Sequence, residues 1–315
     1  MKKTSITNRI IWITLAFIGW YIVCGELMAW PFYMIIDRIK HLLSNEVTFV
    51  ITIYTITLPA VIVFLLVCVL TKKNRFMLEI LKPTRAKKSM SKLGMGLLLG
   101  FLTNFFCVAC ALLHGDIKLY YDFSLTQIPF MLFALVSVFI QSSSEEIWTR
   151  TFLYERINIH YPLWVAILVN GALFGLLHSF NDGITWLAMA DLIACGIFYS
   201  LLRWYSGSIW TCMGIHTMWN FTQNLIFGLP NSGLVSEASI FHLDASTGIS
   251  NLIYSYEFGV EGALPAVFME IFPAIIILLL AKRDGRLGEL LLSKEKTDEL
   301  IDQKPEPDKY VQFSE

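Results

Sequence analysis

Long apolar runs separated by short polar stretches extend from near the start of the chain to residue 281. A helix needs about 20 apolar residues to cross the hydrocarbon core of a bilayer. Because lipid cannot satisfy the hydrogen bonds of an open strand, each such run is predicted to be helical. Eight runs qualify, namely 10–36, 47–71, 93–114, 128–157, 162–178, 184–205, 208–227 and 262–281. The pattern predicts an all-α polytopic membrane protein with about eight transmembrane helices.

The apolar runs leave no block long enough for a separate soluble domain. We therefore expect one transmembrane domain over residues 1–281, with its chemistry concentrated in residues 141–224. The remaining residues, 282–315, are rich in lysine, aspartate and glutamate. Such a composition cannot bury enough apolar surface to fold alone, so a cytoplasmic and partly disordered tail is expected.

Lysine and arginine are distributed unevenly between the polar stretches. They cluster in residues 2–9, 72–92 and 282–286, whereas the longest stretch on the opposite side, 228–261, contains neither. Positively charged residues that flank spans remain in the cytoplasm. Both termini are therefore predicted to be cytoplasmic, which agrees with an even number of spans.

The composition supports a membrane location and excludes one class of partner. Hydrophobic residues make up 56% of the chain and charged residues 16%, against roughly 25% charged in soluble domains. The net charge is −1, and the basic residues lie beside apolar runs rather than in a patch of their own. A nucleic-acid partner is therefore not expected, and membrane lipids are. With no organellar address in the sequence, a bacterial plasma membrane is the expected location.

Titratable side chains inside membrane spans are costly, so each is a candidate functional residue. Three of the predicted spans carry polar or aromatic residues four positions apart, the spacing that places two side chains on one helix face. These residues are Glu145, Glu146 and Arg150; Phe174 and His178; and His216 and Asn220.

The two adjacent glutamates are expected to have different roles, because neighbouring residues point about 100° apart on a helix. Glu146 precedes Arg150 by four residues, the favourable order for an ion pair. Glu145 has no partner at helical spacing in this interpretation and is left free to face a cavity. Counting the helical rise from the cytoplasmic ends places Glu145, His178, His216 and Asn220 at similar depths near mid-membrane. They are expected to meet there, in a site reached from the cytoplasm.

The elements Glu-Glu-x-x-x-Arg, Phe-x-x-x-His and His-x-x-x-Asn, in this order on successive spans, resemble the CAAX protease and bacteriocin-processing (CPBP, Abi) family of intramembrane peptidases. The resemblance covers residues 141–224 and departs from many members at Thr151, where they have glycine. It implies an endopeptidase that cleaves a peptide or protein substrate near the membrane. Glu145 would activate water, His178 would position it, and His216 and Asn220 would stabilise the oxyanion, with Glu146, Arg150 and Phe174 in support.

The cofactor remains open at this point. Activation of water by a glutamate requires no metal. Glu145, His178 and His216 also form a plausible Zn²⁺ ligand set, because catalytic zinc commonly takes three such ligands and a water. The helical HExxH signature of zinc peptidases is absent from the sequence.

Two other classes of function compete with the peptidase. A non-catalytic immunity or scaffold protein could use the same fold, and single histidines often serve only to bond helices together in lipid. An ion-coupled transporter is the third possibility. Its best clues are Glu26, Asp191 and Glu270, which we otherwise interpret as structural or cavity-lining, and its main objection is the lack of internal repeats.

Overall fold

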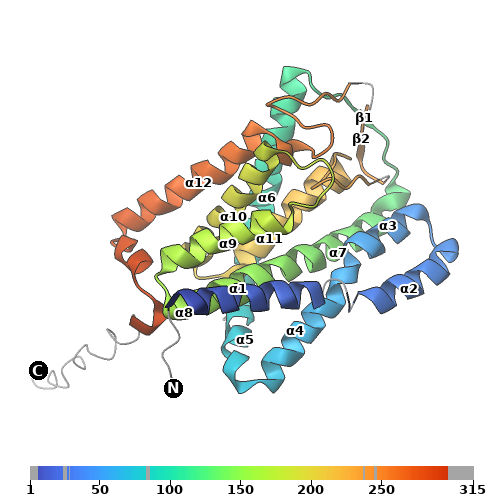
Figure 1. Ribbon diagram of the computed structural model, residues 1–315. Helices are drawn as coiled ribbons and strands as arrows, with labels where there is room; N and C mark the ends of the chain where they lie inside the picture. The colour runs from blue at the N-terminus through green and yellow to red at the C-terminus, as the bar shows by residue number, and fades with distance from the viewer. Residues whose placement is uncertain are drawn as a thin grey trace, which may run out of the picture.

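The computed structural model describes residues 6–23, 27, 29–82, 86–236, 238–244 and 247–296, and the chain is mostly helical (Figure 1). The helices are α1 (Ile6–Ile22), α2 (Trp30–Ile39), α3 (Asn45–Ile53), α4 (Leu58–Leu70), α5 (Phe76–Leu81), α6 (Ala86–His114), α7 (Ile128–Glu146), α8 (Tyr154–His160), α9 (Leu163–Leu177), α10 (Trp186–Ser206), α11 (Ile209–Phe221) and α12 (Leu264–Arg283). A π-helical turn, Ile147–Leu153, joins α7 to α8. The one departure from an all-α fold among these residues is a pair of three-residue strands, β1 (Leu119–Tyr121) and β2 (Phe241–Leu243).

Within the described part of the chain, five helices are long and apolar enough to cross a membrane. They are Asn45–Leu70, Lys88–His114, Leu125–His160, Trp186–Ser206 and Leu264–Arg283. Two further apolar helices, Arg9–Ile22 and Leu163–Leu177, are shorter. The count of eight spans therefore stays a prediction.

The single span expected over residues 10–36 stays a prediction, because α1 ends at Ile22, α2 begins at Trp30, and residues 24–26 and 28 lie outside the described residues. Pro31 occupies the first turn of α2. Proline lacks the N–H that a continuing helix would need and is favoured in a first turn. Glu26, one of the three acids noted in the sequence, lies outside the described residues, as do residues 297–315 of the predicted tail.

Helix α11 is the inner helix of the bundle. Eleven of its thirteen residues are buried, and it packs against α6 and α7, while α10 packs against α9 and α12. In Figure 1, the axes of α1, α7 and α9 lie roughly along one another, with chain direction reversed in α7. Because α11 is enclosed by other helices rather than by lipid, its length need not match the thickness of a bilayer.

The start of α1, the turn from α8 to α9 and the segment after α12 meet at one end of the bundle, which we call the basic end. There the Ile10 N–H donates to the Tyr161 hydroxyl over 3.1 Å, and the Leu163 N–H donates to the Leu292 carbonyl over 3.1 Å. Lys92 Nζ donates to the Ser206 carbonyl at the same end. The described parts of the basic segments thus lie at one end of the bundle, while the cytoplasmic placement of both termini stays a prediction.

The opposite end, which we call the loop end, is formed around residues 228–261. Strand β1 follows α6 and pairs antiparallel with β2, with Leu119 opposite Leu243. This small sheet lies at the upper right of Figure 1. It ties the α6–α7 connection to the long loop that follows α11.

Glycines allow α6 and α11 to approach closely. A Cβ atom built on Gly100 would clash with the Ile215 carbonyl oxygen, and one built on Gly96 would clash with that of Thr211. Small residues four apart are a common means of bringing membrane helices together.

We predict that Gly100→Ala destabilises the protein by about 1–3 kcal/mol, because the added methyl group overpacks the α6–α11 contact. Thermal unfolding of the purified protein in detergent measures the loss. Gly94→Ala on the same helix is the matched control, since its Cβ would meet nothing within 4 Å. Equal unfolding temperatures for the two variants would show that this contact does not limit stability.

Candidate active site

The two glutamates lie where α7 ends and the π-helical turn begins. Such turns are rare and occur frequently at functional sites. The Thr149 hydroxyl donates to the Glu145 carbonyl over 2.5 Å within this turn. The irregular turn therefore occurs at the motif that carries the two carboxylates.

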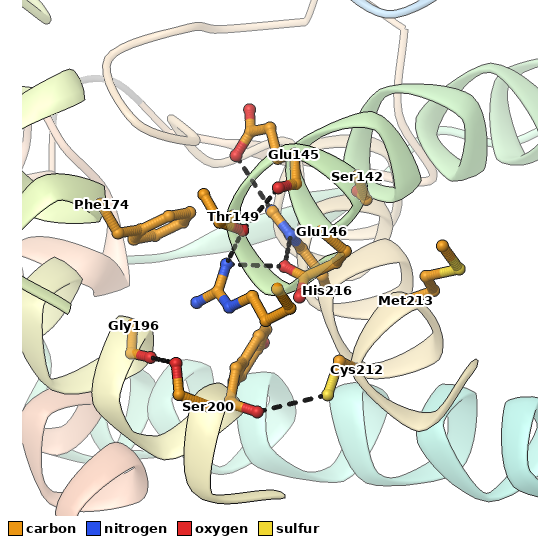
Figure 2. Close-up of polar contacts among 12 residues, drawn as sticks. Ser142, Glu145, Glu146, Thr149, Phe174, Gly196, Ser200, Cys212, Met213 and His216 are labelled. Carbon is orange, nitrogen blue, oxygen red and sulfur yellow. Dashed lines mark hydrogen bonds and ion pairs between the residues drawn. The ribbon is translucent and has the colours of Figure 1, made fainter. Parts of the chain in front are cut away.

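Glu146 lies at the centre of a buried ionic chain (Figure 2). Arg150 Nη1 donates to Glu146 Oε1 over 3.1 Å, and both side chains are 0% exposed. This confirms the ion pair predicted from their spacing. The same Glu146 oxygen lies 2.9 Å from His216 Nδ1. Since only an N–H can donate to a carboxylate, His216 carries a proton on Nδ1, and its Nε2 is turned toward Glu145.

The Arg150 guanidinium also contacts the aromatic residue of the second motif. Its Cζ lies 4.6 Å from the centroid of the Phe174 ring and 5.3 Å from that of Tyr199. A guanidinium over an aromatic face gains electrostatic stabilisation that is larger when water is excluded. Arg150 thereby links the helices that bear the first two motifs.

Glu145 faces both histidines. Its Oε2 lies 3.9 Å from Nε2 of His178 and 3.9 Å from Nε2 of His216. His178 is held by an Nδ1–H bond of 2.8 Å to the Phe174 carbonyl, which leaves its Nε2 free for the site. Separations of 3.9 Å are too long for direct hydrogen bonds, but a single water can bridge such groups. Glu145 Oε2 has no direct hydrogen-bond partner among the described residues.

Glu145 does have a partner at helical spacing, and the expectation that it has none is wrong. Gln141 Nε2 donates to Glu145 Oε1 over 2.5 Å. Gln141 Oε1 in turn accepts from Asn220 Nδ2 over 3.3 Å, and Asn220 Oδ1 accepts from Asn231 Nδ2 over 3.2 Å. The four-residue spacing of Gln141 and Glu145 was the signal in the sequence that could have identified this pair.

Asn220 therefore lies at the site, but its amide is already engaged. Nδ2 also lies 3.4 Å from the Ser142 hydroxyl. Donation to an oxyanion would require this amide to exchange partners, and that role stays a prediction.

A cavity of about 190 Å³ lies beside Glu145. Five of the residues predicted from the motifs line this cavity, namely Glu145, Phe174, His178, His216 and Asn220. Glu146 and Arg150 are not part of the lining, but they contact His216 and Phe174, respectively. Other cavity-lining residues were missed or left without a role in the site, namely Gln141, Asp191, Asn231, Ser232, Glu261 and Glu270.

The loop end supplies one wall of this cavity. Glu261 accepts hydrogen bonds from Trp219 Nε1 at 2.9 Å and from the N–H and hydroxyl of Ser232, each at 2.8 Å. Burial raises the pKa of the Glu261 carboxyl even though these hydrogen bonds favour its ionised form. Ser232 has a left-handed backbone with φ of 49°. Such strain in a non-glycine residue is retained where the surroundings fix it, commonly at functional sites.

Loops at the loop end contribute several residues to the lining of the cavity, and access from the basic end, expected from the sequence, stays a prediction. The cavity is lined by Asn181, Asn231, Ser232, Leu234 and Glu261, all in loops at the loop end. Helix α9 starts at the basic end and ends just before His178, so this histidine lies near the loops. The depth count along single helices could not reveal which loops fold over the site.

The three residues proposed as zinc ligands do not form a zinc site as they lie. Bond lengths of 2.0–2.1 Å in a tetrahedral site place ligand atoms about 3.3 Å apart, whereas Glu145 Oε2 is 3.9 Å from each imidazole. Across the described ranges, no group of three or more His, Cys, Asp or Glu side chains is arranged to hold a metal ion.

We predict that Arg150→Ala lowers the stability of the folded protein by about 3–5 kcal/mol, because it leaves the Glu146 carboxylate buried without its partner. The yield of folded protein and its unfolding temperature in detergent measure this loss. The double variant Glu146→Gln/Arg150→Met is the control, since it leaves no stranded charge and should recover part of the loss. A double variant no more stable than Arg150→Ala would contradict the assignment.

One of three comparisons with known proteins found a match, and that match covers the candidate site. Searches of curated proteins and of solved structures returned no match. Residues 127–222 match the family model described as Type II CAAX prenyl endopeptidase Rce1-like. This range spans α7 to α11 and contains all seven residues predicted from the motifs. Together with the five long apolar helices, the match supports a multi-pass membrane protein whose residues 127–222 are similar to the Rce1-like CAAX endopeptidase family.

Proposed function

We propose that this protein is an intramembrane endopeptidase, similar to the CAAX proteases, in which Glu145 activates a water molecule to hydrolyse a peptide bond near the membrane. One observation carries the proposal. Glu145 Oε2 lacks a protein hydrogen-bond partner among the described residues and lies 3.9 Å from Nε2 of both His178 and His216. A water held between these three atoms would be positioned and polarised at once.

The proposed reaction uses only side chains of this chain. Glu145 accepts a proton from the water as the oxygen attacks the substrate carbonyl carbon. His216, in its imidazolium form with Nδ1–H held by Glu146, donates its Nε2–H to the oxyanion that forms, and Asn220 donates to it as well. Such donors are most effective where water is excluded. Glu145 then returns the proton to the departing amine, so the peptide bond is broken and the carboxylate is regenerated.

Gln141 is a positioning residue in this scheme. Its amide holds one oxygen of Glu145 and thereby turns the other toward the histidines. The chain of amides from Asn231 through Asn220 to Gln141 couples this orientation to the loop end.

The proposed orientation places the basic end in the cytoplasm, following the positive-inside rule, with about eight spans in a bacterial plasma membrane. The wall of the cavity that the loop end supplies then lies toward the extracytoplasmic side, and the substrate would be a peptide or a membrane-protein segment.

We expect a cysteine introduced at Leu252 in the loop end to react with a membrane-impermeant thiol reagent in intact cells, and one introduced at Lys73 to be protected. Both side chains are exposed in the structure. Labelling after permeabilisation controls for reactivity. The reverse labelling pattern would invert the proposed orientation.

We predict that Glu145→Gln lowers turnover by at least about 100-fold while the protein stays folded, because the amide keeps the shape of the side chain but cannot accept the proton. Turnover of reconstituted protein on membrane peptides, followed by mass spectrometry, measures the loss. Unfolding temperature is measured in parallel.

Asp284→Asn is the matched control, since this half-exposed carboxylate lies at the basic end, away from the cavity. A chelator added to the wild-type protein tests the zinc alternative. Near-normal turnover in a stable Glu145→Gln protein would remove the catalytic assignment and favour a non-catalytic scaffold.

A further inference from the structure

Two further acidic residues line the cavity that contains the proposed catalytic residues. Asp191 lies on α10 and Glu270 on α12, and these helices pack together. Counting from the loop-end starts of their helices, they lie about 8 Å and 9 Å deep, so they share a level. Their side chains belong to the same cavity as Glu145.

Both carboxylates are incompletely satisfied. Asp191 is 3% exposed and Glu270 is 4% exposed. Asp191 Oδ1 and Glu270 Oε2 are buried without a hydrogen-bond partner among the described residues. An unpaired buried carboxylate is costly, and natural structures offset that cost with an opposite charge or hydrogen-bond donors.

The basic side chains at or next to the cavity already have acidic partners. Four carboxylates line it, from Glu145, Asp191, Glu261 and Glu270, and the described lining includes two histidines but no lysine or arginine. Both histidines face Glu145, and Arg150 is paired with Glu146. Glu261 is held by Trp219 and Ser232. The charge of Arg150 also acts on Glu270, but no hydrogen bond or ion pair joins a basic side chain to Asp191 or Glu270 among the described residues.

We propose that Asp191 and Glu270 form a subsite that binds a cationic group of the substrate, an ammonium or a guanidinium, next to the bond that is cleaved. This inference rests on the proposed peptidase function and extends it to the class of substrate. The cation comes from a lysine or arginine side chain or from the amino terminus of a peptide. In either case it supplies several N–H donors to the two unpaired carboxylate oxygens.

The size and the ligands of the site favour an organic cation over a metal ion. The cavity of about 190 Å³ greatly exceeds the roughly 30 Å³ occupied by one water, so it can admit a side chain. Across the described residues, no set of His, Cys, Asp and Glu side chains has the arrangement of a metal site.

The test compares binding of membrane-anchored peptides to the full-length Glu145→Gln protein in nanodiscs, so that cleavage does not disturb the measurement. One pool is N-acetylated and carries lysine at each position in turn, and a second carries norleucine instead. A third pool has norleucine and a free amino terminus, which separates the two sources of the cation. We expect at least one lysine or free-amine peptide to bind ten-fold or more tightly than its neutral counterpart.

Asp191→Asn/Glu270→Gln, introduced into the same background, should abolish that preference without unfolding the protein, since amides replace carboxylates of equal shape. Glu79→Gln is the control, because it removes an exposed carboxylate at the basic end and should leave the preference intact. Equal binding of cationic and neutral peptides, including no binding of either, would overturn the inference. So would thermal stabilisation by Na⁺ or Ca²⁺ that depends on Asp191, because it would assign the site to a metal ion.

Cleavage by the wild-type protein is measured separately on the same pools. A cation preference in binding with no cleavage would contradict the peptidase proposal and leave the subsite standing. Cleavage without any preference for a cation would support the peptidase proposal and overturn the cation subsite.

Discussion

The buried ion pair between Glu146 and Arg150 is the interaction on which the rest of the site depends. Neither side chain is exposed, so each charge would be costly to bury without the other. The same Glu146 oxygen fixes His216, and the Arg150 guanidinium lies over the Phe174 ring. Phe174 in turn holds His178 through its carbonyl group. The salt bridge therefore orients the His216 imidazole directly and packs against Phe174, whose backbone carbonyl holds His178.

A second set of polar contacts approaches Glu145 from the loop end. Amide side chains run from Asn231 through Asn220 to Gln141 and fix one oxygen of the Glu145 carboxylate. The other oxygen faces the histidines. The carboxylate is thus held from one side and left open on the other, which is the arrangement that a general base acting on water requires.

Acidic side chains outnumber basic ones in the lining of the cavity. Both histidines face Glu145, whereas on the side formed by α10 and α12 the Asp191 and Glu270 carboxyl groups retain buried oxygens without partners among the described residues. A cationic substrate group would complete the hydrogen bonds of these oxygens. In this proposal, the residues that select the substrate lie on α10 and α12, whereas the residues that act on the peptide bond lie on other helices.

The sequence by itself determined the helical membrane character, the segregation of basic segments, and the Glu146–Arg150 pair, because apolar length, charge distribution and i,i+4 spacing are local properties. It also predicted that Glu145, His178, His216 and Asn220 meet at one site. Only the tertiary structure decided that Gln141 bonds to Glu145, that the loop end supplies one wall of the cavity, and that Asp191 and Glu270 line the same cavity. These features depend on how loops fold back and which helix faces meet, and neither is encoded in the periodicity of any single segment.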